Sequence, residues 1–173
     1  MKTLEINCHS VLDVGGGELP IKDRVKSFEV KKYRILDNEA EFRPDIFGDL
    51  NFIVDVDSPY DTLFCLEVFE YVWNPVQAIE NIASFLKPGG VAYVSFPTIY
   101  PLHNPPGIDY LRYTKFGVEK LLAHAGFKSW EITPRVATLG QKSLADFYRY
   151  EGMHPMKGTS MIYEIGYLVK ALV

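Results

Sequence analysis

The sequence lacks the features that mark several large protein classes. It has only two cysteines, Cys8 and Cys65, in no C-x-x-C pair, which argues against a disulfide scaffold and a thiolate zinc site. Its four histidines form no i, i+4 pair on a helical pattern, so we expect no metal site built on such a pair. No apolar run reaches the roughly 18 residues of a membrane span, and the N-terminal stretch is too polar for a secretory signal. We therefore expect a cytoplasmic protein with no membrane partner.

Basic charge is also scarce. The formal net charge is -4 at pH 7 and the isoelectric point lies near 5.6, whereas proteins that bind nucleic acid usually carry a basic footprint. We therefore expect no nucleic-acid partner, and we interpret the one basic cluster as a solvated face: Lys22, Arg24, Lys26, Lys31 and Lys32. With 173 residues and 47% hydrophobic content, the chain fits a single domain over residues 1–173 with a sizeable core.

Short apolar runs that stop at glycine, aspartate or turn residues predict strands. Such runs, typical of strands buried on both faces, occur at 9–14, 32–37, 44–50, 61–68 and 91–96. Two final strands are expected at 127–134 and 161–173, with too little helical pattern between them for a crossover. These last two strands favour an antiparallel pairing at one edge of the sheet.

Helical periodicity separates most of these strands. The spacing of Ile21, Val25 and Phe28 predicts a short helix, and a second helix opens at Thr114 and stops at Gly126. The clearest helix covers 74–90, with a cap, a first-turn proline and one apolar stripe: Asn74, Pro75, Val76, Ile79, Ile82 or Ala83, and Leu86. The alternation predicts an α/β fold, a doubly wound, Rossmann-like, mostly parallel seven-stranded sheet with an antiparallel edge hairpin.

Four candidate ligand loops fall at predicted carboxyl ends of strands, where open α/β sheets bind their ligands. They are the glycine loop in "VLDVGGGELP", Asp37, Asp49 and the segment after Cys65. A dinucleotide fingerprint would need a third glycine at Pro20, so an NAD or FAD loop is disfavoured. No G-K-[ST] follows for a P-loop, and no tyrosine has a lysine four positions on, as short-chain reductases require.

The ligand of this architecture that remains is S-adenosylmethionine, which has no phosphate and needs only close approach of the backbone. Gly15 and Gly17 would supply that approach. Asp37 could accept both ribose hydroxyls, and Asp49 could accept from the adenine amino group. For both aspartates the plainer alternative of capping a turn stays open.

The chain resembles the class I S-adenosylmethionine-dependent methyltransferases, and among them the methyltransferase type 11 group. The resemblance covers residues 10–127 and rests on "VLDVGGG", "YRILD", "FGDL", "YDTLFCLEVFEYVWNPVQAIENIASFLKPGGVAYVSFP" and "GVEKLLAHAGF". It implies one methyltransferase-like domain with S-adenosylmethionine as cofactor. Three departures from the family pattern are Leu19 in place of a third glycine, Glu70-Tyr71 in place of a frequent Glu-His, and a short stretch before the first strand.

The resemblance also assigns roles to individual positions. It implies that Asp13 and the loop Gly15, Gly16 and Gly17 line the methionine and ribose end of the cofactor, and that Asp37 holds the ribose. It further implies that Asn38 borders the adenine, that Asp49 and Leu50 meet its polar edge, and that the methionine moiety lies over Cys65, Leu66 and Glu67. From its residue type alone, Cys65 is interpreted as a packed core thiol. Glu67 either serves the amino group of the cofactor or starts a helix.

Acceptor chemistry is expected in the proline-rich loop "PTIYPLHNPPGIDYLRYT", because long ordered loops are commonly functional. His103 is the candidate catalytic base for an acceptor hydroxyl, with a structural or solvent-facing histidine as the alternative. Arg112 either pairs with Asp109 or holds an acidic substrate. The loop resembles a segment of type 11 members associated with surface-polysaccharide biosynthesis.

These observations lead to one function hypothesis and one alternative. The first is methyl transfer from S-adenosylmethionine to a small-molecule acceptor, with a sugar or glycan precursor as the candidate. The alternative, from a different class, is a non-catalytic binding or assembly module that kept the fold. A homodimer is the candidate assembly, if apolar surface is left bare by the short N-terminal stretch.

Overall fold

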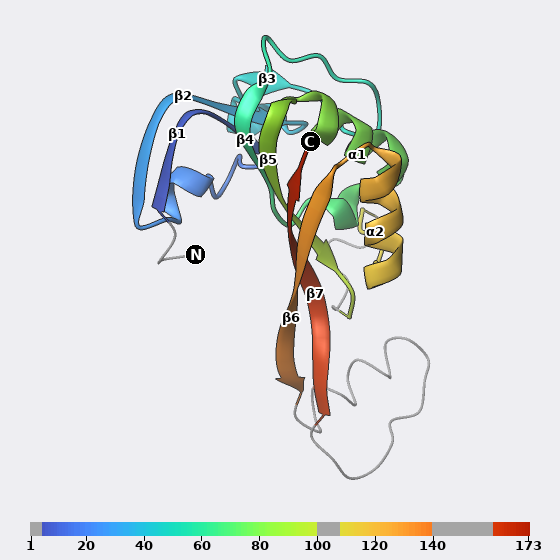
Figure 1. The fold of residues 1–173 in the computed structure, drawn as a ribbon. Helices are drawn as coiled ribbons and strands as arrows, with labels where there is room; N and C mark the ends of the chain where they lie inside the picture. Colours follow the sequence, from blue (N-terminus) through green and yellow to red (C-terminus); the bar gives the residue numbers. More distant parts are fainter. Residues whose placement is uncertain (1–4, 100–107, 140–160) are drawn as a thin grey trace.

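Seven strands form one mixed sheet. The computed structural model describes residues 5–99, 108–139 and 161–173 and places the strands in the order β3-β2-β1-β4-β5-β7-β6 (Figure 1). The strands are β1 (Glu5–Val14), β2 (Ser27–Asp37), β3 (Ile46–Phe47), β4 (Tyr60–Cys65), β5 (Leu86–Pro97), β6 (Ser129–Leu139) and β7 (Met161–Leu172). Strands β1 to β5 are parallel to one another, whereas β7 runs antiparallel between β5 and β6. The predicted sheet, with its antiparallel pair at one edge, is confirmed.

Helix α1 (Pro75–Ser84) follows from its caps and its apolar face. The Asn74 side chain accepts from the backbone N–H of Gln77 at 3.5 Å, and a proline occupies the first turn. Ala78, Ile79 and Ile82 are buried. The helix ends earlier than predicted, because the "LKPGG" stretch belongs to β5, and Val76 of the predicted apolar stripe lies exposed.

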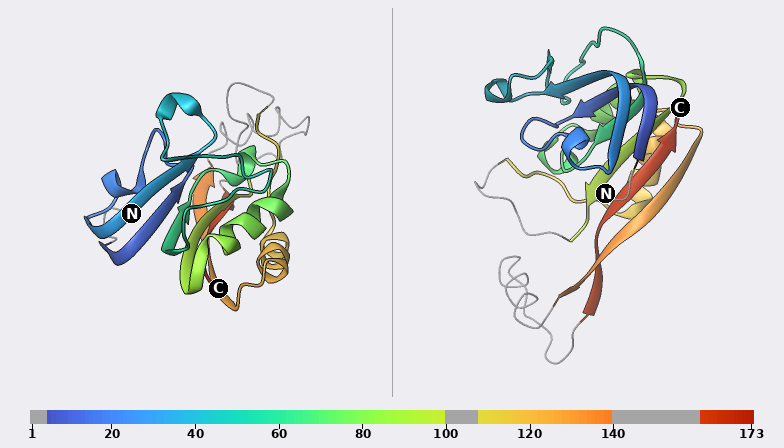
Figure 2. Two further views of the ribbon diagram at one scale, coloured as in Figure 1. Left: turned by 90° about the horizontal axis from the view of Figure 1, so that it is seen from above. Right: turned by 90° about the vertical axis from the view of Figure 1, so that its left-hand side faces the viewer.

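Helix α2 (Lys115–His124) lies beside α1 on the same face of the sheet (Figures 1 and 2). The Thr114 hydroxyl accepts from the N–H of Gly117 at 3.2 Å and caps the helix, as expected. Val118 and Leu122 are buried in the main hydrophobic core, which lies between the two helices and the sheet. Gly126, with φ of 83°, follows its end.

The opposite face has no such helix among the described residues. The helix predicted from Ile21 to Phe28 is wrong: only a 3-10 turn, η1 (Ile21–Asp23), forms there, and β2 already begins at Ser27. The reason is distance. β1 and β2 pair in parallel along their whole length, so residues 15–26 must return over roughly 30 Å. A helix rises only about 1.5 Å per residue and could not span that distance, whereas a mostly extended chain can.

A small second core fills part of this face. It contains Ile6, Val11, Ile21 and Phe64. Phe64 also stacks on Tyr93 of β5, with ring centroids 5.0 Å apart and planes 9° apart. The turn η1 therefore contributes one side chain to a core that a longer helix would otherwise cover.

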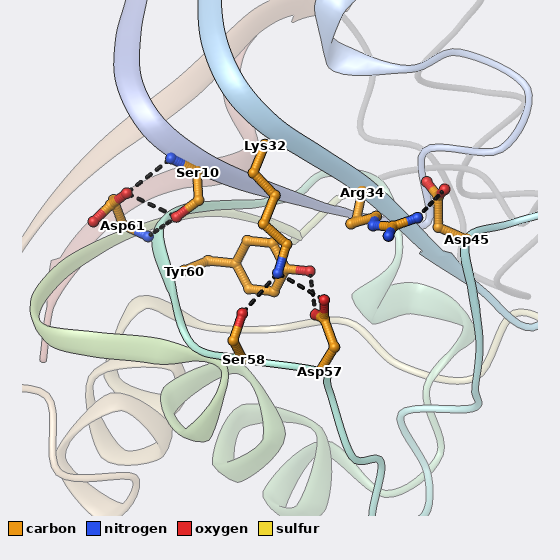
Figure 3. A network of polar contacts seen from close by, with 8 residues as sticks. All are labelled: Ser10, Lys32, Arg34, Asp45, Asp57, Ser58, Tyr60 and Asp61. Atoms are coloured by element: carbon orange, nitrogen blue, oxygen red, sulfur yellow. Dashed lines mark hydrogen bonds and ion pairs between the residues drawn. The ribbon is translucent and has the colours of Figure 1, made fainter.

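Polar contacts tie β1 and β2 to the segment that enters β4 (Figure 3). The Ser10 N–H and hydroxyl donate to Asp61 Oδ2 at 2.8 and 2.7 Å. Lys32 donates to Asp57 Oδ2 at 2.7 Å and lies over the ring of Tyr60, 4.6 Å from its centroid. Part of the basic cluster predicted as a solvated face therefore joins two elements of the fold.

Candidate functional site

The glycine loop follows β1 at the carboxyl edge of the parallel strands. The Gly15 N–H donates to the carbonyl of Leu36 on β2 at 2.8 Å, and Gly15 has φ of 72°. A Cβ at Gly15 would lie well under 3.0 Å from Val68, which follows β4. The loop therefore needs glycine at this position, both for its backbone angle and for its close contact with the neighbouring segment.

Asp13 holds this loop from beneath. Its Oδ2 accepts from the N–H of Ile21 and from the hydroxyl of Tyr33, both at 2.6 Å. Burial raises the pKa of Asp13 above its ordinary value, although both hydrogen bonds act in the opposite direction. Gly16 packs directly on this carboxylate. Asp13 therefore ties the loop to η1 and β2.

Asp37 ends β2 beside the glycine loop, as predicted. Its Oδ2 accepts from the N–H of Gly17 at 3.1 Å, and its Oδ1 accepts from the N–H of Glu39 at 3.0 Å. The residue is only 8% exposed. The turn-capping alternative considered from the sequence is therefore real, and the same carboxylate also reaches the predicted loop.

Phe42 belongs to the site, although sequence reasoning missed it. It ends a 3-10 turn, η2 (Ala40–Phe42), directly after β2. A Cβ at Gly17 would lie 2.5 Å from Cδ2 of the Phe42 ring and 2.8 Å from Oδ2 of Asp37. The ring, the glycine and the carboxylate therefore converge on one point. An aromatic residue close behind the aspartate that ends a strand was the available signal.

The residues predicted to border an adenine, Asn38, Asp49 and Leu50, follow further along the chain. Asn38 is exposed and Leu50 is buried. Asp49 Oδ1 accepts from the N–H and the side-chain amide of Asn51, both at 2.9 Å, so its turn-forming alternative is also real. The Gly48 N–H donates to the carbonyl of Asp37 at 3.0 Å, which keeps this segment next to the end of β2.

Two asparagines that the sequence reading did not single out fix this segment to α1. The Asn81 amide donates to the carbonyls of Leu50 and Phe52 at 3.1 and 2.7 Å. Asn51 Oδ1 accepts from the N–H of Asn74 at 2.9 Å. Asn81 is a polar side chain within the buried stripe of a helix, and that position was the signal for it.

The segment after β4 brings backbone and one side chain to the rim. Cys65 is fully buried, and burial raises its pKa well above the ordinary value, so the interpretation as a core thiol is confirmed. Leu66 is half-buried against the second core. Glu67 is exposed and has φ of 59°. Its N–H donates to Ser95 Oγ at 2.7 Å, and the Ser95 hydroxyl donates to Glu67 Oε1 at 3.1 Å.

The described part of the expected acceptor loop is anchored at the same rim. The carbonyl of the buried Glu70 accepts from the N–H of Tyr110 at 2.7 Å. Arg112 pairs with Asp109, whose side chain is 1% exposed, which is one of the two alternatives considered for this arginine. His103 lies outside the described residues.

The comparisons with known proteins agree with this arrangement. Residues 47–94, which run from the end of β3 into β5, match the family described as a methyltransferase domain, type 11. This match covers less than a third of the chain. The mostly parallel sheet with an antiparallel pair at one edge, and the glycine loop after its first strand, are those predicted above.

One curated relative is similar to this chain over part of its length. The ubiquinone biosynthesis O-methyltransferase of Rickettsia conorii is 30% identical over 103 residues, which are 53% of this chain and 36% of the relative. The chain thus spans about a third of that curated relative.

Solved structures share the fold. A protein of Bacillus halodurans C-125, provisionally assigned as a methyltransferase, has a TM-score of 0.65 at 14% identity, covering 96% of this chain and 93% of that one. An S-adenosylmethionine-dependent methyltransferase from Mesorhizobium loti has a TM-score of 0.61 at 16% identity, covering 99% of this chain and 94% of that one.

The rim fits S-adenosylmethionine, the cofactor expected from the sequence, in its donor set. Gly15 and Gly17 carry no side chain that would stand between their backbone and a ligand, and the Asp37 carboxylate is an acceptor of the kind that a ribose diol needs. The place beside Gly17 is filled by the Phe42 ring rather than left open. Within the described ranges, no helix is long and apolar enough to cross a membrane, and no three His, Cys, Asp or Glu residues are grouped to hold a metal ion.

Proposed function

We propose that this domain binds S-adenosylmethionine at the carboxyl rim of β1, β2 and β4 and transfers its methyl group to a hydroxyl of a small molecule. The meeting of the Asp37 carboxylate with Gly17 at the end of two adjacent parallel strands is the observation that carries the proposal. Asp37 would bind the ribose diol, and the glycine loop would pass against the methionine end. Asn38, Asp49 and Leu50 would border the adenine.

The cofactor supplies a methyl group already activated on a sulfonium. The protein then needs mainly to align the acceptor oxygen with that methyl group and to exclude water. Orientation of the reactants can lower the activation barrier by several kcal/mol. The rigid rim supports alignment, because Gly15 and Asp37 are both hydrogen-bonded to neighbouring elements. We propose His103 as the base that takes the hydroxyl proton.

The acceptor is proposed by class. The O-methyltransferase from Rickettsia conorii supports an oxygen acceptor. The resemblance of the proline-rich loop to type 11 members of surface-polysaccharide biosynthesis favours a sugar or glycan precursor. The buried Asp109 holds Arg112 at this side of the rim, where a polar acceptor would meet it. We also propose that the protein forms a homodimer. Light scattering that reports only monomer would refute the homodimer.

The second candidate, a module that binds without turnover, is favoured by the Phe42 ring beside Gly17 and by the use of Asp13 for internal hydrogen bonds. The two candidates differ in one assay. Cofactor binding together with methyl transfer to any member of an acceptor panel supports the enzyme, whereas binding with no transfer across the panel supports the module.

Isothermal calorimetry with S-adenosylmethionine and its demethylated product tests the cofactor site. We expect Asp37→Ala to weaken binding of either ligand by about 10- to 100-fold, the value of a charge-assisted hydrogen bond. Asp55→Ala, at an exposed aspartate in the segment between β3 and β4, is the control and should bind like the wild type. Folded wild-type protein that binds neither ligand would refute the proposal.

A further inference from the structure

We propose that Phe42 sets the cofactor affinity of this domain by covering the nucleoside subsite, so that the cofactor binds only when the ring moves aside. The inference rests on the proposed function, because it concerns the same rim. It adds a residue that neither the family resemblance nor the sequence reading assigns to the site.

The Phe42 ring lies directly against Gly17. The place of a Cβ at Gly17 is 2.5 Å from Cδ2 and 2.6 Å from Cγ of Phe42, and contacts below 3.0 Å are essentially never made by real Cβ atoms. Not even one carbon fits between this glycine and the ring. A bare glycine that leaves backbone open to a ligand is here in contact with a side chain of the protein itself.

The Asp37 carboxylate lies beside the same point. The same point beside Gly17 lies 2.8 Å from Oδ2 of Asp37, and Asp37 is only 8% exposed. A ribose diol that uses Asp37 must approach this carboxylate, and the ring stands at that approach. The ring and the ribose therefore compete for one place.

The Phe42 ring is held only loosely in its place. Phe42 is 40% exposed, and the turn η2 that carries it buries no residue. Arg43, which ends the turn, has φ of 50°, a left-handed angle that is unfavourable for a residue with a side chain. A half-exposed ring on a short, strained turn can leave its place at small cost, whereas a ring in the core could not.

The consequence follows from population arithmetic. If the subsite is open only in a fraction of molecules, the apparent dissociation constant rises by the inverse of that fraction. Removing the ring should therefore tighten binding, by roughly 5- to 30-fold if the cover contributes what partial burial of one aromatic side chain usually does. A larger ring should weaken it.

Calorimetry with S-adenosylhomocysteine, the demethylated product, measures the effect without turnover. We expect Phe42→Ala and Phe42→Leu to bind it more tightly than the wild type, and Phe42→Trp to bind it more weakly. Phe116→Ala is the matched control, because Phe116 is 75% exposed on α2 and takes no part in the rim. Its affinity should equal that of the wild type.

Nuclear Overhauser contacts give a second readout. In the free protein, the Phe42 ring protons should show contacts to the Cα protons of Gly17, and S-adenosylhomocysteine should abolish them. Contacts that persist in the complex would overturn the inference. An affinity of Phe42→Ala equal to or weaker than that of the wild type would also overturn it. A weaker affinity would mean that the ring stacks on the base instead of covering the subsite. Wild-type protein that fails to bind would overturn the proposed function and this inference together.

Discussion

Truncation of Asn81 should loosen the contact between helix α1 and the segment that carries Asp49 and Leu50. The Asn81 amide, 3% exposed, donates to the carbonyl of Leu50 at 3.1 Å and to that of Phe52 at 2.7 Å. In Asn81→Ala both carbonyls lose their donor. The first is enclosed by the core, and the second lies nearer to solvent.

The size of the effect can be built from these contacts. A buried carbonyl left without a partner costs about 1–3 kcal/mol, and loss of the more accessible bond adds about 0.5–1.5 kcal/mol. The better helix propensity of alanine returns about 0.5 kcal/mol. The free energy of unfolding should therefore fall by roughly 1–4 kcal/mol, which for a chain of this size lowers the melting temperature by roughly 2–16 °C.

Urea denaturation followed by circular dichroism measures this loss directly. Val76→Ala, at an exposed position of α1, is the matched control and should lower the free energy of unfolding by less than about 0.5 kcal/mol. A loss in Asn81→Ala no larger than that of the control would refute the reasoning. It would mean that water satisfies the Leu50 carbonyl, and that this segment does not depend on α1 for its position.

Two further predictions concern the glycine loop and the buried thiol. Gly15→Ala should lower the free energy of unfolding by roughly 2–4 kcal/mol, because it combines a left-handed backbone angle with a clash against Val68. Gly89→Ala shares the positive φ but has nothing within 4 Å, so a loss near 1 kcal/mol is expected, and equal losses in urea titrations would contradict the clash. Native protein should react with a thiol reagent at no more than one cysteine, and Cys65 should be modified only on unfolding; mass spectrometry that finds it labelled in folded protein would show that the core opens.

Local sequence signals predicted much of this molecule. The caps Asn74 and Thr114 begin their helices where expected, because a side-chain oxygen that binds the first turn acts within a few residues. The glycine loop and Asp37 meet because parallel neighbours bring their carboxyl ends to one edge. In each case the decisive interaction lies within one turn or one strand pair.

The failures have a common physical cause. The spacing of Ile21, Val25 and Phe28 is as helical as that of many surface helices, but the distance back along β1 excluded a helix, and no local window contains that distance. Phe42 and Asn81 likewise gain their roles from partners at Gly17 and Leu50, which the fold alone brings near. Long-range geometry therefore overrode local preference at the places where the candidate site is built.

The position of β7 has a consequence for synthesis on the ribosome. β7 lies between β5 and β6, yet it is the last of the described strands along the chain. Until residues 161–172 emerge, the backbone of β5 has a bare edge, and β6 has no neighbour to pair with. At translation rates of about 5–20 residues per second, that edge stays open for several seconds, during which it can recruit a strand from another nascent chain. The yield of folded protein should therefore depend on how quickly the final segment is delivered.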